Sequence, residues 1–541
     1  MPSSVAQSSI YRSKAADSPP AASPPFLSIL FDRQASGQDI DSHEAPDFFA
    51  DLNLDQIVES VTAGRDEYAL KPYFYSPLEQ IETIQYRHEV LRDLENPALF
   101  QAVRSFAEQM RKMRECLAQS SQLYYQRQKQ FLFLDAVEGY WAAVAGLAGE
   151  LAEIHPNSHG FRAFKDYLIG YVGSGAFNEL GAAVQDLRTA LSSIRYLLHI
   201  DGSRVSASRY DSEPDYSSEV LRTFEKFSQG TAKGYRFNIR FDLEMNHVEA
   251  AILDMVARLF PEIFGRLDEF CLRFDNYADG ALVRFDREVQ FYIAWLEYIH
   301  RFRQADLSFC YPTVTNTSKE IYGQEVFDLA LANRLITENR RVVTNDFYLK
   351  DPERIFIVSG PNQGGKTTFA RTLGQLHYLA RLGCPVPGSA GRLFFFDRLF
   401  THFEREEDVQ NLRGKLEDEL LRIRHILEQT TSASILVMNE SFLSTTVTDA
   451  LFLSREIMQR VIDLDMLCAS VTFLDELASL CEKTVSMVST VNPDDPALRT
   501  FKIVRKPADG LAYAAALAEK HKLTYQAVKA RLAAKVTGEI G

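Results

Sequence analysis

Residues 360–368 read G-P-N-Q-G-G-K-T-T and directly follow residues 354–359, R-I-F-I-V-S, an apolar run of strand character. The stretch fits the frame G-x-x-x-x-G-K-[ST], in which backbone N–H groups wrap phosphates, the lysine neutralises their outer oxygens and the hydroxyl ligates Mg²⁺. Glycine is required where the backbone must curl tightly and approach a phosphate without a Cβ. The sequence therefore predicts a strand, a phosphate-binding loop and a helix, and with them a nucleoside triphosphate site.

The helix expected after this loop has apolar residues at helical spacing through residues 368–382. The phosphates would then lie at a helix N-terminus, where unpaired N–H groups and the helix dipole favour anions. The alternative is an ordinary glycine-rich turn between a strand and a helix. The residues predicted to bind ATP are Gly360, Pro361, Asn362, Gln363, Gly364, Gly365, Lys366, Thr367 and Thr368, with Thr367 also a predicted Mg²⁺ ligand.

A second strand, residues 434–438, ends in Asn439 and Glu440. P-loop ATPases place an acidic Mg²⁺ partner and then a water-activating carboxylate at this point. The amide oxygen of Asn439 can still accept from a metal-bound water, but without a negative charge it predicts weaker Mg²⁺ binding. Glu440 is the predicted catalytic base. The alternative is that both residues simply end a buried strand.

The length and composition of the chain argue against several other classes of protein. A chain of 541 residues is too long for one core, and a net charge of −14 argues against a protein that coats nucleic acid over its whole surface. Six cysteines without a C-x-x-C pair indicate neither a disulfide framework nor a zinc site. No apolar stretch reaches membrane length, the nearest being residues 140–151. A cytoplasmic protein is expected.

The chain before residue 320 is predicted to be mainly helical. Residues 76–79, S-P-L-E, read as a capping box that opens a helix, and Asn96-Pro97 as its break. The turn Asp201-Gly202 between alternating segments predicts a β-hairpin. Residues 249–299 read as two helices that separate near residues 275–280.

The last third of the chain has the alternation of an α/β fold with a largely parallel sheet. Its predicted strands are residues 341–349, 355–358, 393–396, 435–438, 466–471 and 500–504. The full division predicted is a disordered, Ser- and Pro-rich tail at 1–25, a helical core domain at 26–130, a helical lever at 131–320 with a short clamp-like insertion near 198–240, an ATPase domain at 321–508 and a C-terminal helical dimerisation element at 509–541.

A basic stretch stands out against the negative average of the chain. Residues 222–240 contain five positively charged side chains and one acidic side chain, Glu225. The stretch is a candidate contact for a nucleic acid backbone, although a solvated charged surface is the commoner explanation. Its cations are Arg222, Lys226, Lys233, Arg236 and Arg240.

Several motifs together resemble the ATPase domain of the MutS family of DNA mismatch repair proteins, a branch of the ABC-type ATPases. Residues 360–368 are similar to the family's G-P-N-M-G-G-K-S-T, and residues 396–401, F-D-R-L-F-T, to its I-D-R-I-F-T. Residues 343–346, V-T-N-D, resemble the F-V-P-N-D element that borders the adenine, which implies ATP contacts at Asn345 and Asp346. Residues 510–518 are similar to the C-terminal helices used for dimerisation.

The resemblance implies an ABC-type P-loop ATPase domain that binds ATP and Mg²⁺, acts as a homodimer and has DNA as its partner. Three positions depart from the family pattern. The signature loop S-T-F-x-x-E, which reaches the opposite subunit's nucleotide, aligns with residues 414–419, so Gly414 replaces its Ser while Glu419 remains. Asn439 replaces the acidic Mg²⁺ partner, and Phe473 replaces the His of the A-T-H switch.

Two function classes are compatible with these residues. The first is a dimeric, DNA-binding ATPase with weakened hydrolysis. Mismatch recognition of the usual kind is not expected, because about 25 residues precede the helical core. No nuclease domain is expected after the C-terminal helices. The second is a nucleotide-gated interaction protein in which ATP binding alone is the switch. A small-molecule kinase is a weaker third reading, because no acceptor-site pattern is visible. Which DNA structure or pathway is involved does not follow from the sequence.

Overall fold

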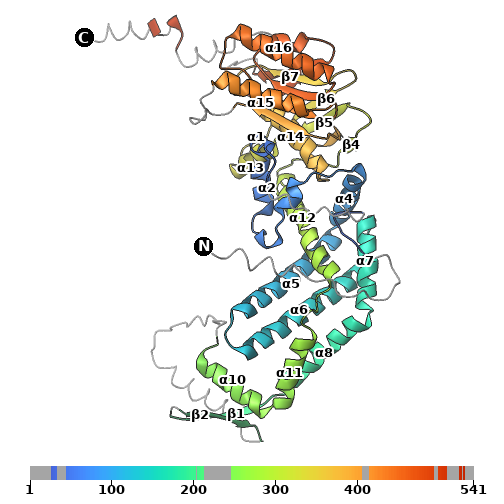
Figure 1. Cartoon of the computed structure of the whole chain (residues 1–541), viewed down its shortest axis with the longest axis vertical. Coiled ribbons are helices and arrows are strands. Elements are labelled where there is room, and N and C mark those ends of the chain that lie inside the picture. The colour runs from blue at the N-terminus through green and yellow to red at the C-terminus, as the bar shows by residue number, and fades with distance from the viewer. Residues whose placement is uncertain are drawn as a thin grey trace, which may run out of the picture. The chain divides into compact units, whose positions relative to one another are not determined.

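The computed structural model describes residues 26–32, 44–202, 204–211, 245–404, 414–492, 498–508, 523–526 and 528–529. These residues belong to two compact units (Figure 1). Unit 1 contains Leu27–Arg92 and the chain from Arg287 onward, and unit 2 contains Asp93–Asp286. The unit boundaries fall inside helices α4 (Ile81–Leu94) and α12 (Gly280–Arg303).

Unit 2 is built from helices with well-defined ends. Pro97 takes the first position of α5, and the Asn96 side chain accepts a hydrogen bond from the Ala98 N–H, so the predicted helix break is also an N-cap. The side chains of Ser158 and Ser174 cap the N-termini of α7 and α8 by accepting from the N–H groups of Phe161 and Phe177. The helices are α5 (Pro97–Gln122), α6 (Gln126–Glu153), α7 (His159–Val172), α8 (Gly175–Ser192), α10 (His247–Leu259) and α11 (Pro261–Arg273).

The core of unit 2 combines stacked aromatic rings with a partly buried group of polar side chains. The rings of Phe164 and Phe285 stack with their centroids 3.6 Å apart. The Tyr167 hydroxyl donates to Asp279 Oδ2 at 2.8 Å, and the Asp279 N–H donates to the Tyr140 hydroxyl at 2.9 Å. These bonds connect α6 and α7 to the residue just before α12, so the loop after α11 is fixed to the helical core.

Helix α6 contains the apolar residues 140–151. Among the helices in the described ranges, it is the one whose length and composition would allow it to cross a membrane, and 44% of its most apolar window is buried inside the fold. The sequence reading of a stretch too short to span is therefore revised, because the helix has 28 residues. Its buried residues Val137, Tyr140, Val144 and Leu151 pack in the core of unit 2.

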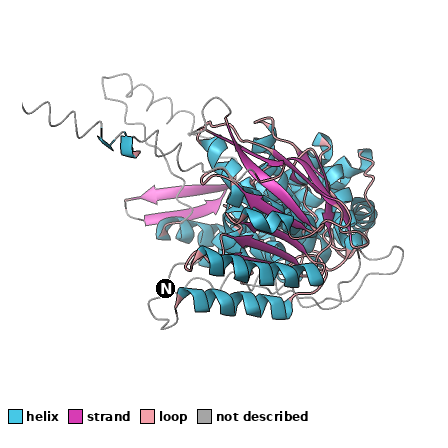
Figure 2. Cartoon of the chain, turned by 90° about the horizontal axis from the view of Figure 1, so that it is seen from above, coloured by secondary structure: helices cyan, strands magenta, loops and turns pink. Residues whose placement is uncertain are grey.

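The predicted β-hairpin is present. Strands β1 (Tyr196–Asp201) and β2 (Arg204–Arg209) pair antiparallel, with Asp201 opposite Arg204 across the turn, and they lie side by side in Figure 2. Gly202 takes the left-handed conformation that this tight turn requires, with φ of 58°. Helix α8 ends at Ser192, before the first strand of the hairpin begins at Tyr196. The remainder of the proposed clamp-like insertion, to residue 240, lies outside the described residues.

Two helix predictions need correction. The helix expected to open at Ser76 begins at Ile81, because the backbone of Leu78 is committed elsewhere: its N–H donates to the Arg381 carbonyl at 2.8 Å, and its carbonyl accepts from the Arg381 guanidinium. Residues 249–299 contain three helices rather than two. Pro261 ends α10 and begins α11, since proline is tolerated at the first position of a helix but not within one.

A six-stranded sheet forms the centre of unit 1, in the order β10-β11-β12-β7-β13-β14. The first five strands are parallel, and β14 pairs antiparallel with β13. This agrees with the largely parallel sheet expected from the sequence. Its strands are β7 (Ile355–Ser359), β10 (Leu399–Phe403), β11 (Ile435–Asn439), β12 (Leu467–Val471), β13 (Thr484–Val491) and β14 (Arg499–Arg505).

Two predicted strands belong to a different sheet. Residues 393–396 and 341–349 correspond to β9 (Ala390–Phe394) and β6 (Asn345–Leu349), which lie in a four-stranded sheet of order β4-β9-β5-β6. The sequence pattern had not identified β10 and β13, which complete the large sheet. Smaller elements of unit 1 are β3 (Phe309–Cys310), β4 (Thr313–Thr315), β5 (Ile321–Val326), β8 (Val386–Pro387), α1 (Phe48–Asp51), α2 (Leu54–Thr62), α3 (Lys71–Tyr75), α13 (Leu329–Thr337) and the 3₁₀ turns at Asp66–Tyr68 and Asp475–Ser479.

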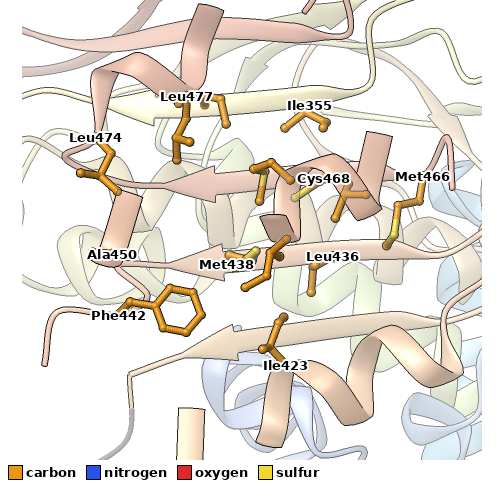
Figure 3. Close-up of a cluster of buried hydrophobic side chains, with 14 residues drawn as sticks. Ile355, Ile423, Leu436, Met438, Phe442, Ala450, Met466, Cys468, Leu474 and Leu477 are labelled. Carbon is orange, nitrogen blue, oxygen red and sulfur yellow. The ribbon is translucent and has the colours of Figure 1, made fainter. Parts of the chain in front are cut away.

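Helices cover both faces of the large sheet. Helix α14 (Lys366–Arg381) packs on one face, where the Phe369 ring lies 6.1 Å from that of Phe356 in β7. Helices α15 (Lys415–Gln429) and α16 (Val447–Asp463) contribute to a hydrophobic cluster with β7, β11 and β12. Figure 3 shows Ile423 of α15 and Phe442 in this cluster with Leu436 and Met438 of β11. A parallel sheet buried on both sides explains why its strands read as continuous apolar runs.

Buried histidines make the stability of unit 1 depend on pH. Burial lowers the pKa of both His88 and His377 from 6.5 to about 4. Between these values the unfolded chain binds protons that the folded chain excludes, so stability should fall as the pH falls from 6.5 towards 4. Each histidine should contribute a slope of up to about 1.4 kcal/mol per pH unit.

Urea unfolding between pH 7 and pH 4.5 measures this slope. We expect His377→Gln to flatten it, while His425→Gln, which changes an exposed histidine of α15, leaves it unchanged. Equal slopes for the His377 variant and the unchanged chain would contradict the assignment.

Candidate nucleotide-binding site

The loop between β7 and α14 has a tightly curled backbone, in which glycine is needed at the most crowded positions. Gly360 and Gly365 have φ of 114° and 91°, and Gln363 has φ of 59°. A Cβ on Gly360 would lie 2.9 Å from the Ser489 carbonyl oxygen, and one on Gly364 would lie 2.2 Å from Ser489 Oγ. Strand β13 therefore presses against the loop from one side. Gly365 is the N-cap of α14, so the unpaired N–H groups of the helix begin at this loop.

Lys366 lies over the loop. Its Nζ donates to the carbonyls of Gly360 at 2.9 Å and Pro361 at 3.3 Å, and to Asn362 Oδ1 at 3.2 Å. The side chain is only 5% exposed. Burial lowers the pKa of the Lys366 ammonium, while the nearby Glu440 carboxylate raises it. The result is a buried positive charge surrounded by loop oxygens.

Thr367 connects the loop to β11. Its Oγ1 donates to Asn439 Oδ1 at 2.7 Å, so the two predicted Mg²⁺ ligands lie within hydrogen-bonding distance of each other. Hydroxyl and amide oxygens are hard donors that suit Mg²⁺, which usually takes only one or two protein ligands beside phosphates and water. Across the described ranges no cluster of three His, Cys, Asp or Glu side chains is placed to hold a metal ion. The residues fit an ion whose remaining ligands come from the nucleotide.

Glu440 immediately follows β11 at the same edge of the sheet. Its carboxylate lies 3.8 Å from Lys366 Nζ and is partly exposed, at 33%. Its backbone has a φ of 51°, and its N–H donates to the Val471 carbonyl at 2.9 Å. The hydrogen bond fixes the start of the loop to β12, and the side chain points towards Lys366. A partly solvated carboxylate here can accept a proton from a water.

Phe473, the residue at the switch position, lies just after β12 at the same edge of the sheet. The Thr472 N–H donates to the Val358 carbonyl of β7 at 3.0 Å, which holds the end of β12 beside the start of the P-loop. Phe473 follows directly and is 47% exposed. A phenyl ring has no donor or acceptor, so this residue cannot order a water or bind a phosphate.

The two signature-loop residues differ in their surroundings. Gly414 is exposed and forms the N-cap of α15. Glu419 is 3% exposed, and its Oε2 accepts a hydrogen bond from the Phe442 N–H at 2.8 Å. The Glu419 carboxylate is therefore buried within its own chain, and the place of Gly414 and Glu419 in a loop that faces a second subunit stays a prediction.

Asn345 and Asp346 both have hydrogen bonds to neighbouring strands. Asn345 Oδ1 accepts from the Ile503 N–H at 2.7 Å, and its Nδ2 donates to the Phe501 carbonyl at 3.2 Å. Asp346 Oδ1 accepts from the Glu325 N–H at 2.7 Å. These side chains attach β6 to β14 and β5, which is a structural role beside the ATP contacts predicted for them.

Three residues at the site were not predicted. Ser489 Oγ donates to the Gly364 carbonyl at 2.8 Å, and Arg499 Nε donates to the Asn362 carbonyl at 3.2 Å. His402 is buried beside the turn that follows Glu440, and its Nδ1 lies 2.9 Å from Ser441 Oγ. None belongs to a local motif, because each reaches the site from another strand. The five cations between Arg222 and Arg240 lie outside the described residues.

Comparison with known proteins identifies the same part of the chain. The family model MutS domain V matches residues 356–533. The chain is similar to DNA mismatch repair protein MutS 2 of Halobacterium salinarum, with 32% identity over 121 residues, 22% of this chain and 14% of the relative. It is also similar to MSH3 of Kluyveromyces lactis, with 29% identity over 141 residues, 26% of this chain and 14% of the relative.

A third relative, DNA mismatch repair protein MutS of Psychrobacter cryohalolentis, is 28% identical over 171 residues, which are 31% of this chain and 16% of the relative. The similarity thus spans about one seventh of the length of these curated proteins. Residues 356–533, about a third of the chain, are thus a MutS domain V, and this part of the chain belongs to the MutS family.

Proposed function

We propose that this chain is a MutS-related ATP-binding protein that works as a dimer, binds DNA structure and hydrolyses ATP slowly. The observation that supports this most is the contact between the P-loop and β11, where Thr367 meets Asn439 at 2.7 Å and Lys366 meets Glu440 at 3.8 Å. A phosphate loop, two metal-compatible oxygens and one carboxylate then lie at a single sheet edge, which is the arrangement that phosphoryl chemistry uses.

The proposed mechanism assigns one role to each residue. Lys366 and the loop N–H groups would bind the β- and γ-phosphates, and Thr367 and Asn439 would hold Mg²⁺. The ion would neutralise charge on the phosphate oxygens. Glu440 would accept a proton from the water that attacks the γ-phosphorus, while the bond from this phosphorus to the oxygen of the β-phosphate breaks and ADP leaves. Its partial exposure allows water to reach the carboxylate without opening the core.

The residues at three positions of the site predict slow hydrolysis. Asn439 offers an amide where a full negative charge would hold Mg²⁺ more tightly. Phe473 offers no polar atom at the switch position, and Gly414 offers no hydroxyl to a second copy. Removing one preorganised polar group from such a site commonly costs on the order of a hundredfold in rate. Binding of ATP relies on Lys366 and the loop backbone, so it should survive these changes.

The same three residues favour a second candidate function, a nucleotide-gated interaction protein in which ATP binding is the switch. The two candidates differ in what they require of Glu440. If Glu440→Gln keeps the cellular phenotype while Lys366→Ala abolishes it, binding alone is the function. If both variants lose the phenotype, hydrolysis is required.

DNA is proposed as the partner because the relatives are named DNA mismatch repair proteins, and because of the basic stretch between residues 222 and 240. A titration against duplex, branched and single-stranded DNA at several salt concentrations, with and without ATP, tests this part. Binding should weaken steeply as salt rises, because phosphate contacts release counterions. Absent or salt-insensitive binding would remove nucleic acid from the proposal. A cytoplasmic location remains the expectation that accompanies this partner.

Lys366→Ala should weaken ATP binding by about 10- to 100-fold, because it removes a charged donor from the phosphates. Glu440→Gln should bind ATP as the unchanged chain does and lose hydrolysis. A fluorescent ATP analogue and a phosphate-release assay separate the two effects. Lys112→Ala, on the exposed side of α5, is the matched control. Unchanged affinity in the Lys366 variant would contradict the site.

Asn439→Asp should raise the hydrolysis rate by about tenfold or more and lower the Mg²⁺ concentration needed for half-maximal rate, since it restores the missing charge. The variant keeps an acceptor for Thr367 Oγ1, so the loop should keep its shape. Asn339→Asp, an exposed change after α13, controls for the added charge. A rate and a Mg²⁺ dependence equal to those of the unchanged chain would show that Asn439 does not limit hydrolysis.

A further inference from the structure

The turn that carries Glu440 has an unfavourable backbone conformation. Glu440 and Phe442 have φ of 51° and 64°, in the left-handed region that side chains other than glycine seldom adopt. Two such residues within three positions persist only when the surrounding structure fixes them. The contacts that fix this turn therefore decide where the Glu440 carboxylate points.

Each of the three turn residues is held from a different direction. The Glu440 N–H donates to Val471 of β12 at 2.9 Å. Ser441 Oγ lies 2.9 Å from His402 Nδ1 on β10, and the Phe442 N–H donates to Glu419 of α15 at 2.8 Å. The Phe442 side chain is fully buried in the hydrophobic cluster of Figure 3.

Glu419 and His402 form a connected support beneath the turn. Glu419 lies on the buried face of α15, one helical turn before Ile423, and is 3% exposed. His402 is 1% exposed, and its Nε2 lies 3.3 Å from the Glu419 backbone carbonyl. Burying a carboxylate is unfavourable unless it accepts hydrogen bonds, and a bond from a backbone N–H to an ionised carboxylate is among the stronger ones. The Glu419 carboxylate thus holds the backbone of Phe442 through this hydrogen bond.

We propose that Glu419 and His402 are positioning residues that hold the 440–442 turn so that Glu440 faces the phosphate-binding lysine. The inference rests on the proposed role of Glu440 in hydrolysis. Neither side chain contacts Lys366 or the P-loop among the hydrogen bonds of the described chain. They act through the backbone of Phe442 and the side chain of Ser441.

The chain offers graded variants for a test. Glu419→Gln keeps a carbonyl that can accept from the Phe442 N–H, whereas Glu419→Leu keeps the approximate size and removes the acceptor. Ser441→Ala removes the contact to His402 and leaves the core intact, so it serves if the leucine variant does not fold. Glu417→Leu lies on an exposed position of the same helix and is the control.

Steady-state ATP hydrolysis gives the first readout. Glu419→Leu should lower kcat on the order of ten- to a hundredfold, since a small misplacement of a catalytic group has effects of this size, and should leave KM within about threefold. Glu419→Gln should recover most of the rate, and Ser441→Ala should fall between the two. A kcat for Glu419→Leu equal to that of Glu417→Leu would overturn the proposal.

Amide hydrogen exchange gives a second readout that does not require turnover. The peptide spanning residues 440–443 should exchange faster in Glu419→Leu, while the P-loop peptide spanning 359–366 exchanges as before. Unchanged exchange at 440–443 would overturn the positioning role. Loss of turnover in Glu419→Leu with full turnover in Glu440→Gln would instead refute the proposed role of Glu440, and a rate in the unchanged chain no higher than in Lys366→Ala would refute hydrolysis itself.

Discussion

The parallel arrangement of β7, β12 and β11 is the constraint from which the candidate site follows. Because these strands run in the same direction, their carboxyl ends meet at one edge of the sheet. The P-loop, the Asn439-Glu440 pair and Phe473 therefore come together, although Asn439 is 72 residues after Thr367 in the sequence and Phe473 a further 34 residues after Asn439. The hydrogen bond between Thr367 and Asn439 then connects the phosphate loop to β11 across the intervening strand. Parallel α/β sheets generally bind their ligands outside the carboxyl ends of the strands.

Under the proposed function, the residues at this edge separate nucleotide binding from hydrolysis. Binding would rely on a buried lysine and on backbone groups, which do not depend on the departures at Asn439, Gly414 and Phe473. Hydrolysis would rely on the metal and on the attacking water. Asn439 affects the metal directly, and Phe473 affects the water. A chain of this kind can retain a nucleotide-dependent conformation while its chemistry slows. The balance between the two functions is set by few side chains, so it can be examined one residue at a time.

Sequence reasoning located the parts of the structure that are determined locally. The P-loop, the end of β11, the hairpin turn at Gly202 and the break at Asn96 each depend on residues that are close together in the chain. Predictions from sequence were wrong where a contact between residues far apart in the chain determines the local structure. The capping box at Ser76 does not open a helix because Arg381, about 300 residues away, uses the backbone of Leu78.

The same limit applies to the site. Ser489, Arg499 and His402 reach it from separate strands, and no spacing in the sequence connects them with Lys366. The comparison with the signature loop singled out Glu419, but no alternation of polar and apolar residues predicts that its side chain is buried. Pro261 was a readable signal that was missed, because a proline within a long apolar helix pattern indicates a helix boundary.

The central claim is that ATP binds in the loop around Lys366 and that binding brings two copies of the chain together. Calorimetry of the full chain with ATP at millimolar Mg²⁺, combined with sedimentation of the same samples, tests both halves directly. The account predicts a saturable heat with one ATP per chain and a shift from monomer to dimer. No heat of binding would contradict the claim, and a saturable heat without any change in sedimentation would contradict the dimer.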